Sequence, residues 1–227
     1  MARATPLQLA PRKKMNSSIR TFRSAINFLN SKTNYDKMTR VGYNATNFNL
    51  SRMSRLLAGV RDDQLGRPTP CSDWTVAELL AHVVQFTAVF TANARRQEAR
   101  PPEELVEDWR VALPRDLAEL AQAWREESAW NGRVSAGGVE MDASANAVVA
   151  MEELTTHSWD LARATEQDVD VDDARLDEVD RFFELFAPQI ASGQGPFGPP
   201  VDAPEPSTRL QRTIARTGRD PWWTPAI

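Results

Sequence analysis

The stretch "MEELTTHSWDLARAT", residues 151–165, decides the fold prediction and contains one of the two histidines in this 227-residue chain. Leu154, Ser158 and Leu161 recur at intervals of four and three residues, which is the spacing of one face of an α-helix. The stretch therefore predicts a helix that lies against a hydrophobic core. We expect this helix to begin near residue 142 and to end near residue 165.

Periodic apolar residues before and after this stretch predict further helices. Thr75 and Glu78 form a capping-box pattern, which marks a helix start, and Pro114 is expected to kink or restart another helix. The segment "GRVSAGG" (132–138) predicts a loop, and no strand pattern competes. The predicted helices cover residues 45–60, 75–97, 103–128, 142–165 and 173–192, with a short one near 207–217. They predict an all-α fold, an up-down four-helix bundle with an additional helix and a short Pro/Gly-rich C-terminal cap.

Charge is distributed unevenly along the chain. The formal net charge is −4, but residues 1–60 carry 11 Lys and Arg against one acid, whereas the remainder carries 16 Arg against 30 acids. Such a break in composition indicates that an extension of different character precedes the domain. We interpret residues 1–40 as a basic, disordered N-terminal extension. A disordered leader is favoured over an arm that binds nucleic acid or lipid, because aromatic and basic residues do not interleave there.

The rest of the chain divides into a bundle and a tail. We expect residues 41–192 to form the bundle and residues 193–227 to form a tail that packs its aromatic residues on the bundle. Those aromatic residues are Phe197, Trp222 and Trp223.

Composition excludes several classes of protein. The single cysteine, Cys71, excludes an intramolecular disulfide framework and a cysteine-based zinc cluster, and we interpret it as a packing residue. No uninterrupted apolar run approaches the length of about 18 residues that a membrane span needs. The sequence therefore predicts a cytoplasmic protein without a nucleic-acid or membrane partner.

Three residues on two predicted helices have the chemistry of a metal site. Glu153 and His157 are four residues apart and share one helix face, and Asp160 continues that line. His82 lies on the stripe of Leu79, Phe86 and Val89 in another helix, so it too is expected to face inward. Imidazole and carboxylate ligands suit Zn²⁺, Ni²⁺ or Fe²⁺. Asp160 is then either an acceptor for a ring N–H of His157 or a fourth ligand.

A non-metal interpretation of the same residues stands beside this one. A Glu–His pair at this spacing is common on ordinary helices, and an inward histidine is often a core residue with satisfied hydrogen bonds. The metal hypothesis is favoured by the fact that both histidines of the chain fall on inward faces and one of them has a carboxylate partner.

Two motifs and the C-terminal tail resemble a known family. "RPTPCSDWTVAELLAHVV" (67–84) is similar to a segment of the DinB-like metal-binding bundles related to mycothiol-dependent maleylpyruvate isomerase, and "EELTTHSWDLARATEQ" (152–167) resembles a second. The tail, which contains "GRDPWW" at residues 218–223, resembles the ending of an actinobacterial branch. The resemblance implies a four-helix bundle whose divalent metal is held by His82, Glu153 and His157. Glu152 is expected to be an ordinary surface acid.

The resemblance leaves two hypotheses for function. The first is a metal-dependent S-transferase or isomerase that uses mycothiol or a related small thiol as cosubstrate and acts on an electrophile, with Zn²⁺ favoured as the metal. The alternative is a non-catalytic bundle that binds a metal or another ligand. Arg163 is a candidate substrate contact or a solvated helix-end residue, and Trp159 is a candidate pocket wall or a core residue.

The chain also departs from this family. The isomerase has a large additional C-terminal domain that contributes to its catalysis, whereas this chain has a short tail. Ser158 and Glu166 stand where the family motif has glycines. These differences leave the expected ligands in place but change the surroundings of the pocket.

Overall fold

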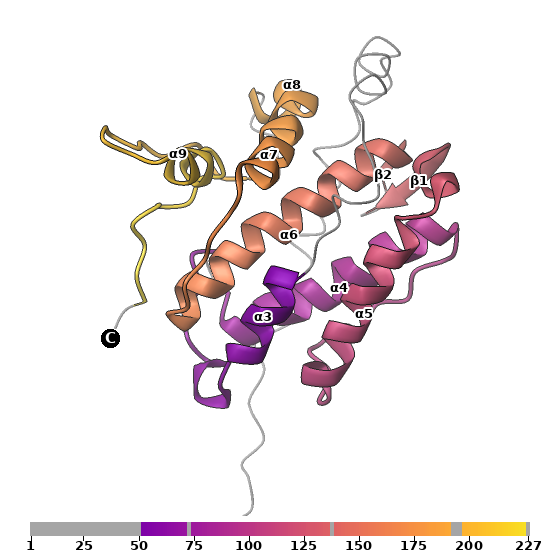
Figure 1. Ribbon diagram of the computed structural model, residues 1–227, viewed down its shortest axis with the longest axis horizontal. Helices are drawn as coiled ribbons and strands as arrows, with labels where there is room; N and C mark the ends of the chain where they lie inside the picture. The colour runs from indigo at the N-terminus through magenta and orange to yellow at the C-terminus, as the bar shows by residue number, and fades with distance from the viewer. Residues whose placement is uncertain (1–50, 72–73, 137–138, 192–196, 226–227) are drawn as a thin grey trace, which may run out of the picture.

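The bundle predicted from helical periodicity is present. The computed structural model describes residues 51–71, 74–136, 139–191 and 197–225. In this part of the chain four helices pack together (Figure 1), and the all-α prediction is confirmed. They are α3 (Ser51–Gly59), α4 (Val76–Arg95), α5 (Trp109–Ala123) and α6 (Ala143–Thr165). The predicted extension 1–40 and the first part of the predicted helix 45–60 lie outside the described residues.

The four helices are not neighbours in their chain order. Helix α3 packs against α5 and α6, and α4 packs against the same two helices, so α3 and α4 occupy opposite corners of the bundle. The chain therefore crosses the bundle diagonally between α3 and α4 and again between α5 and α6. The connections 60–75 and 124–142 are accordingly long.

Helix α4 begins where its capping box predicts. The N–H of Glu78 donates to the Thr75 hydroxyl oxygen at 3.3 Å, and the N–H of Thr75 donates to the Glu78 carboxylate at 2.8 Å. The helix ends at Arg95, followed by Arg96 in the left-handed conformation. Among the described residues α4 is the one helix long and apolar enough to cross a membrane, but 67% of its apolar window is buried inside the protein. A buried core helix meets the same criteria.

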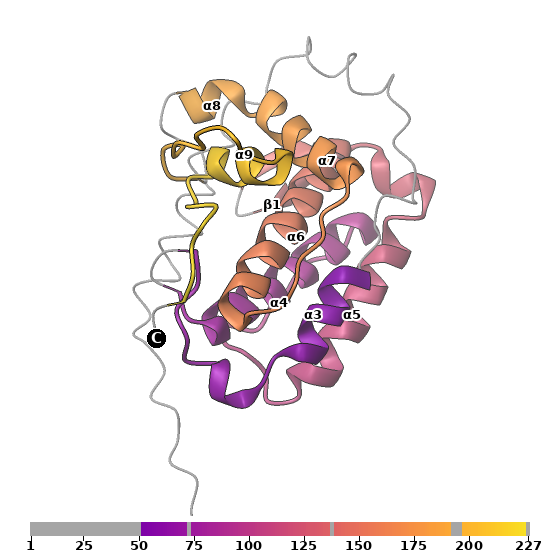
Figure 2. The same cartoon turned by 60° about the vertical axis from the view of Figure 1, so that its left-hand side comes forward.

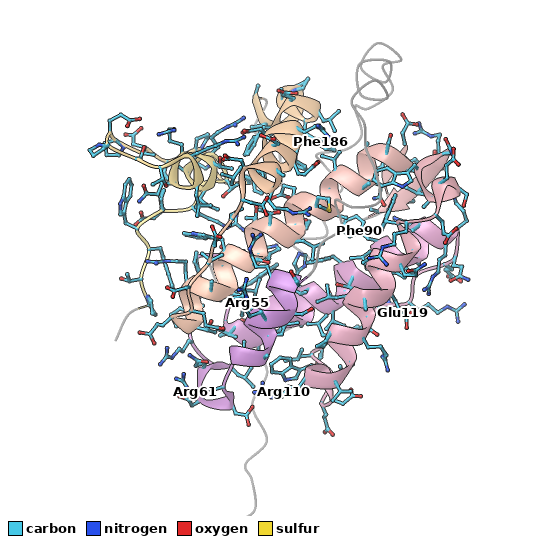
Figure 3. All side chains as sticks on the ribbon, in the orientation of Figure 1. Arg55, Arg61, Phe90, Arg110, Glu119 and Phe186 are labelled. Atoms are coloured by element: carbon cyan, nitrogen blue, oxygen red, sulfur yellow. The ribbon has the colours of Figure 1, made fainter. Side chains whose placement is uncertain are left out.

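Helix α5 is shorter than the predicted 103–128. It begins at Trp109 and passes through Pro114 without a break. Its first turn is attached to the loop after α3, because the Arg110 guanidinium donates to the Val60 carbonyl oxygen at 2.7 Å and to Asp62 at 2.6 Å. Figure 3 shows Arg110 beside Arg61 at this end of the bundle.

The predicted loop 132–138 is wrong, because its residues contribute to a short hairpin. Strands β1 (Arg133–Ala136) and β2 (Val139–Asp142) pair antiparallel, with Val134 opposite Met141. Val134 and Ala136 are buried while the two residues between and before them are exposed. This alternation extends over four residues only, which is too short to distinguish a strand from a loop in the sequence.

The predicted helix 173–192 is divided in two. Helix α7 (Asp173–Leu185) ends before α8 (Ala187–Ala191) begins. Pro188 explains the break, because proline has no N–H to donate to the carbonyl of residue 184. Helix α9 (Arg209–Arg216) then packs on α7, as Figure 2 shows.

Residues 197–225, which we call the C-terminal segment, extend from α9 in both directions. The ring of Phe197 packs against those of Phe182 and Phe183 at centroid distances of 5.4 and 5.5 Å. Trp223 is partly buried against the core. The expectation that Trp222 also packs on the bundle is wrong, because 45% of that residue is exposed.

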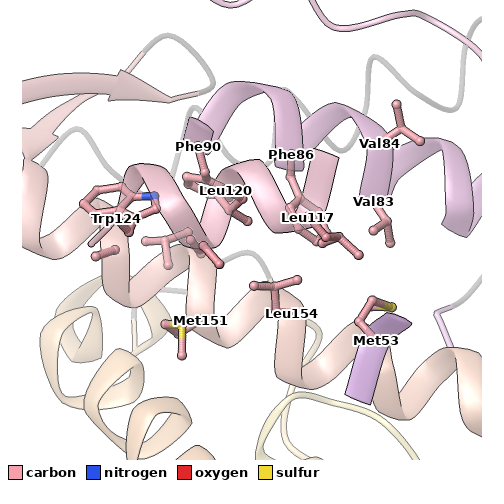
Figure 4. Packing of buried hydrophobic residues seen from close by; sticks show 14 of the residues in the cluster. Met53, Val83, Val84, Phe86, Phe90, Leu117, Leu120, Trp124, Met151 and Leu154 are labelled. Atoms are coloured by element: carbon pink, nitrogen blue, oxygen red, sulfur yellow. The ribbon is translucent and has the colours of Figure 1, made fainter. Parts of the chain in front are cut away.

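The hydrophobic core lies between α4, α5 and α6. Figure 4 shows Phe86 and Phe90 of α4 facing Leu117 and Leu120 of α5, with Leu154 of α6 beneath them. These side chains fix the relative position of α4 and α6. The polar side chains that α4 and α6 direct toward each other are therefore held at fixed positions.

Candidate metal centre

His82 of α4 and Glu153 and His157 of α6 meet at one point. The Nε2 atom of His82 lies 3.2 Å from Glu153 Oε2, and the Nε2 atom of His157 lies 3.0 Å from the same oxygen. The two imidazole rings have centroids 5.0 Å apart and stand nearly perpendicular. The structure thus brings together the three residues that the helix faces selected.

The centre is largely buried. The side chains of Glu153 and His157 are 11% and 8% exposed, whereas 24% of the His82 side chain is exposed. All residues of α6 except Ser144 and Arg163 are buried, because other elements cover this helix on every side. Solvent therefore reaches the centre on the side where the His82 side chain is exposed.

The expectation that Glu152 is a surface acid is wrong. This residue is 2% exposed, and its carboxylate accepts a hydrogen bond from the Thr156 hydroxyl at 2.6 Å. The expectation assumed that α6 had a solvent face, but several elements, α7 among them, pack against this helix and Glu152 is buried. Burial and the neighbouring charge of Glu153 raise the pKa of Glu152 to about 8.

The charges of the three central residues are coupled. Burial raises the pKa of Glu153, but hydrogen bonds from His157 and His82 outweigh burial and hold it well below its usual value. Burial also lowers the pKa of His82. For His157 burial acts in the same direction, but hydrogen bonds to Asp160 and Glu153 outweigh it and raise the pKa to about 9. In the metal-free protein the ionised Glu153 is thus balanced by His157.

Asp160 connects this centre to the C-terminal segment. It is fully buried, and its Oδ2 atom lies 2.8 Å from His157 Nδ1. Arg219 donates from Nε to Oδ1 at 2.7 Å and from Nη2 to Oδ2 at 2.9 Å. Burial raises the pKa of Asp160, but the charge of Arg219 outweighs burial and lowers it. Asp160 is therefore an ionised acceptor.

Cys71 belongs to a second group of potential ligands among the described residues. Ligand atoms of Cys71, His157 and Asp160 lie within 4.8 Å of one another. This group is unsuited to a cation, because Arg219 already neutralises Asp160. Burial and the charge of Asp160 also raise the pKa of the Cys71 thiol to about 12, so the thiol is protonated at neutral pH in the metal-free protein.

Aromatic rings enclose the two histidines. The ring of Trp74 lies 4.8 Å from that of His82 and 6.0 Å from that of His157 between centroids, and Phe86 lies on the other side at 5.5 and 6.3 Å. Sequence reasoning did not select Trp74 as a site residue. Its place in the "PTPC-x-x-W" motif, eight residues before His82, was the available signal.

The structure gives Arg163 a partner in the C-terminal segment and buries Trp159. Arg163 donates from Nε and Nη2 to the Trp223 carbonyl oxygen at 2.9 and 2.5 Å, so it anchors the C-terminal segment. Trp159 is 3% exposed, which favours its role as a core residue.

The donor set fits a divalent cation. Two imidazole nitrogens and one carboxylate oxygen suit Zn²⁺, Ni²⁺ or Fe²⁺ and leave a further coordination position open. Ligand atoms at about 2.0–2.1 Å from a tetrahedral zinc lie about 3.3 Å apart. The distances of 3.2 and 3.0 Å from Glu153 Oε2 to His82 Nε2 and His157 Nε2 are close to this value.

Ionisation of the centre predicts how the stability of the metal-free protein depends on pH. The pKa values of His157 and Glu152 are raised from 6.5 and 4.5 to about 9 and about 8. Each contribution to stability is complete below the unfolded pKa and is lost as the pH rises through the folded pKa. His82, whose pKa is lowered from 6.5, opposes this loss only below about pH 6.5. We expect the free energy of unfolding, measured by urea denaturation in EDTA, to fall between about pH 6.5 and about pH 9.

Glu152→Gln provides the control for this prediction. The amide keeps an oxygen that accepts the Thr156 hydrogen bond but cannot ionise. The variant should lose less stability over the same pH range than the wild-type protein. Equal losses in the two proteins would contradict ionisation of Glu152 near pH 8.

Comparison with known proteins agrees with the motifs in the sequence. Residues 50–162, which include all three residues of the centre, match the family described as the mycothiol maleylpyruvate isomerase N-terminal domain. Uncharacterised proteins from two strains of Mycobacterium tuberculosis are each 33% identical to the chain over 175 residues, covering 72% of this chain and 91% of each relative.

A solved structure is more distantly similar. The crystal structure of a histidine-to-alanine mutant of mycothiol-dependent maleylpyruvate isomerase is 17% identical and has a TM-score of 0.41, over 78% of this chain and 70% of that chain. The assignment rests on the sequence matches instead. On these matches, the chain belongs to the mycothiol maleylpyruvate isomerase N-terminal domain family.

Proposed function

We propose that this protein binds a divalent metal ion, Zn²⁺ by preference, through His82, Glu153 and His157, and uses it in a mycothiol-type S-transferase or isomerase reaction. The observation that supports this most is the meeting of both imidazole Nε2 atoms at one Glu153 oxygen. Membership of a family named for a mycothiol-dependent isomerase supports the choice of thiol.

Glu153 and His82 have different tasks in the proposed centre. Glu153 supplies the negative charge that balances a cation, and its low pKa keeps it ionised at neutral pH. His82 supplies a neutral nitrogen, because burial lowers its pKa. When bound, the metal ion would supply the Lewis acidity that favours the thiolate form of a small thiol.

The surroundings determine where a cosubstrate approaches. His82 is the most exposed of the three residues, and the ring of Trp74 lies against it. A thiol would therefore enter along the His82 and Trp74 side. Phe86 and the buried part of α6 exclude water from the opposite side, which strengthens electrostatic interactions within the centre. The electrophile, an activated alkene or an epoxide, would be attacked on the open side.

A non-catalytic metal- or ligand-binding role is the alternative. The low exposure of Glu153 and His157 favours it, because little surface of the centre remains for a second reactant. In that case the ion would stabilise the junction of α4 and α6. Both hypotheses predict that the protein binds a metal, but only the first predicts that it catalyses a reaction.

Metal content tests the ligand assignment. We expect elemental analysis of protein purified without added metal to give about one divalent ion per chain for the wild type. Glu153→Gln and His157→Ala should contain almost none, because each removes a ligand. The neighbouring Glu152→Gln is the matched control and should keep its metal, since that carboxylate contacts Thr156 instead. Equal and negligible metal in all four proteins would remove the assignment.

Thiol-dependent turnover separates the enzyme from the binding protein. The metal-loaded protein should consume mycothiol with an activated alkene or epoxide, or isomerise an alkene without net thiol consumption. Removal of the metal or Glu153→Gln should slow either reaction at least about 100-fold, because the Lewis acid is lost. Tight metal binding without turnover on the whole panel would instead favour the non-catalytic hypothesis.

A further inference from the structure

We propose that the C-terminal segment completes the metal centre, with Arg219 as a positioning residue that holds the His157 ligand through Asp160. This inference rests on the proposed metal binding by His82, Glu153 and His157. It assigns part of the centre to a residue 59 positions beyond Asp160 in the chain.

The hydrogen bonds define the state of His157. Both oxygens of Asp160 accept hydrogen bonds from the Arg219 guanidinium, so this carboxylate acts as an acceptor, and the proton of the 2.8 Å contact belongs to His157 Nδ1. In the neutral imidazole this arrangement leaves the lone pair on Nε2, the atom that faces Glu153. Asp160 therefore selects the tautomer and the ring orientation that a metal ligand needs.

Asp160 itself depends on Arg219. The carboxylate is fully buried, and both of its oxygens accept from the guanidinium of Arg219, which is 9% exposed. A buried carboxylate without a compensating charge takes up a proton or changes its contacts. Without Arg219, Asp160 would no longer be a fixed acceptor for His157.

Contacts on both sides of Arg219 hold the C-terminal segment in place. Before it, the guanidinium of Arg209 lies 3.0, 2.5 and 2.9 Å from carboxylates of α7, namely Asp173, Asp177 and Asp180. After it, Arg163 of α6 holds the Trp223 carbonyl oxygen. Arg219 thus enters the bundle from a segment that is attached to two helices.

The backbone at Gly218 directs Arg219 inward. Gly218 has a φ of +75°, and a Cβ atom there would lie 3.0 Å from the backbone of Gly198. Another residue would be strained at that φ and would displace the neighbouring chain. This turn lets the chain leave α9 and place the next side chain beside Asp160.

Binding of Co²⁺ to the metal-free full-length protein tests the proposal. Titrations followed by the d–d absorption bands give affinity and coordination geometry together. We expect Arg219→Ala and Asp160→Asn each to weaken Co²⁺ binding by about 10- to 100-fold and to alter the bands. The double variant should bind no more weakly than the weaker single variant, because Arg219 acts through Asp160.

Arg212→Ala is the matched control. Arg212 belongs to the same segment but pairs at the surface with Glu205 at 3.4 Å, so its loss should change Co²⁺ affinity by less than about twofold. If Arg219→Ala does not fold, Arg219→Lys takes its place. Lysine keeps the charge without the two-pronged hydrogen bond, and an intermediate weakening is expected.

The outcomes distinguish this inference from the proposed function. Wild-type Co²⁺ affinity and bands in folded Arg219→Ala or Arg219→Lys, whatever their thermal stability, would show a structural role only and overturn the inference. Failure of the wild-type protein itself to bind Co²⁺ would overturn the metal hypothesis, and this inference with it.

Discussion

The burial of the Glu153 carboxylate on the central helix constrains the rest of the structure. A charge in that position requires partners, and the imidazoles of His82 and His157 provide them from two helices. The core between α4 and α6 must therefore hold these helices in one relative position. Helix α6 is covered on all sides, so its polar residues form internal contacts instead of a solvated face.

The same requirement extends outward from the centre. His157 needs an acceptor for its second ring nitrogen, Asp160 supplies it, and Asp160 in turn needs the charge of Arg219. A short C-terminal segment thereby becomes part of a centre whose other residues lie on the bundle.

The sequence was most informative where local spacing determines contacts. Helical periodicity predicted the bundle, and the faces of two helices selected His82, Glu153 and His157, which the structure brings together. Sequence patterns failed to predict burial and side-chain pairing where these depend on contacts between distant parts of the chain. The burial of Glu152 depends on other elements that pack against α6, and the pairing of Arg219 with Asp160 joins residues 59 positions apart. The hairpin was missed because strands of four residues carry too little pattern.

X-ray absorption spectroscopy of the zinc-loaded, full-length protein tests the central claim most directly. It distinguishes the centre of His82, Glu153 and His157 from the alternative group that contains Cys71. The account predicts nitrogen and oxygen neighbours at about 2.0–2.1 Å, including two imidazoles, and no sulfur. A sulfur neighbour at about 2.3 Å would place the ion at Cys71 and contradict the account.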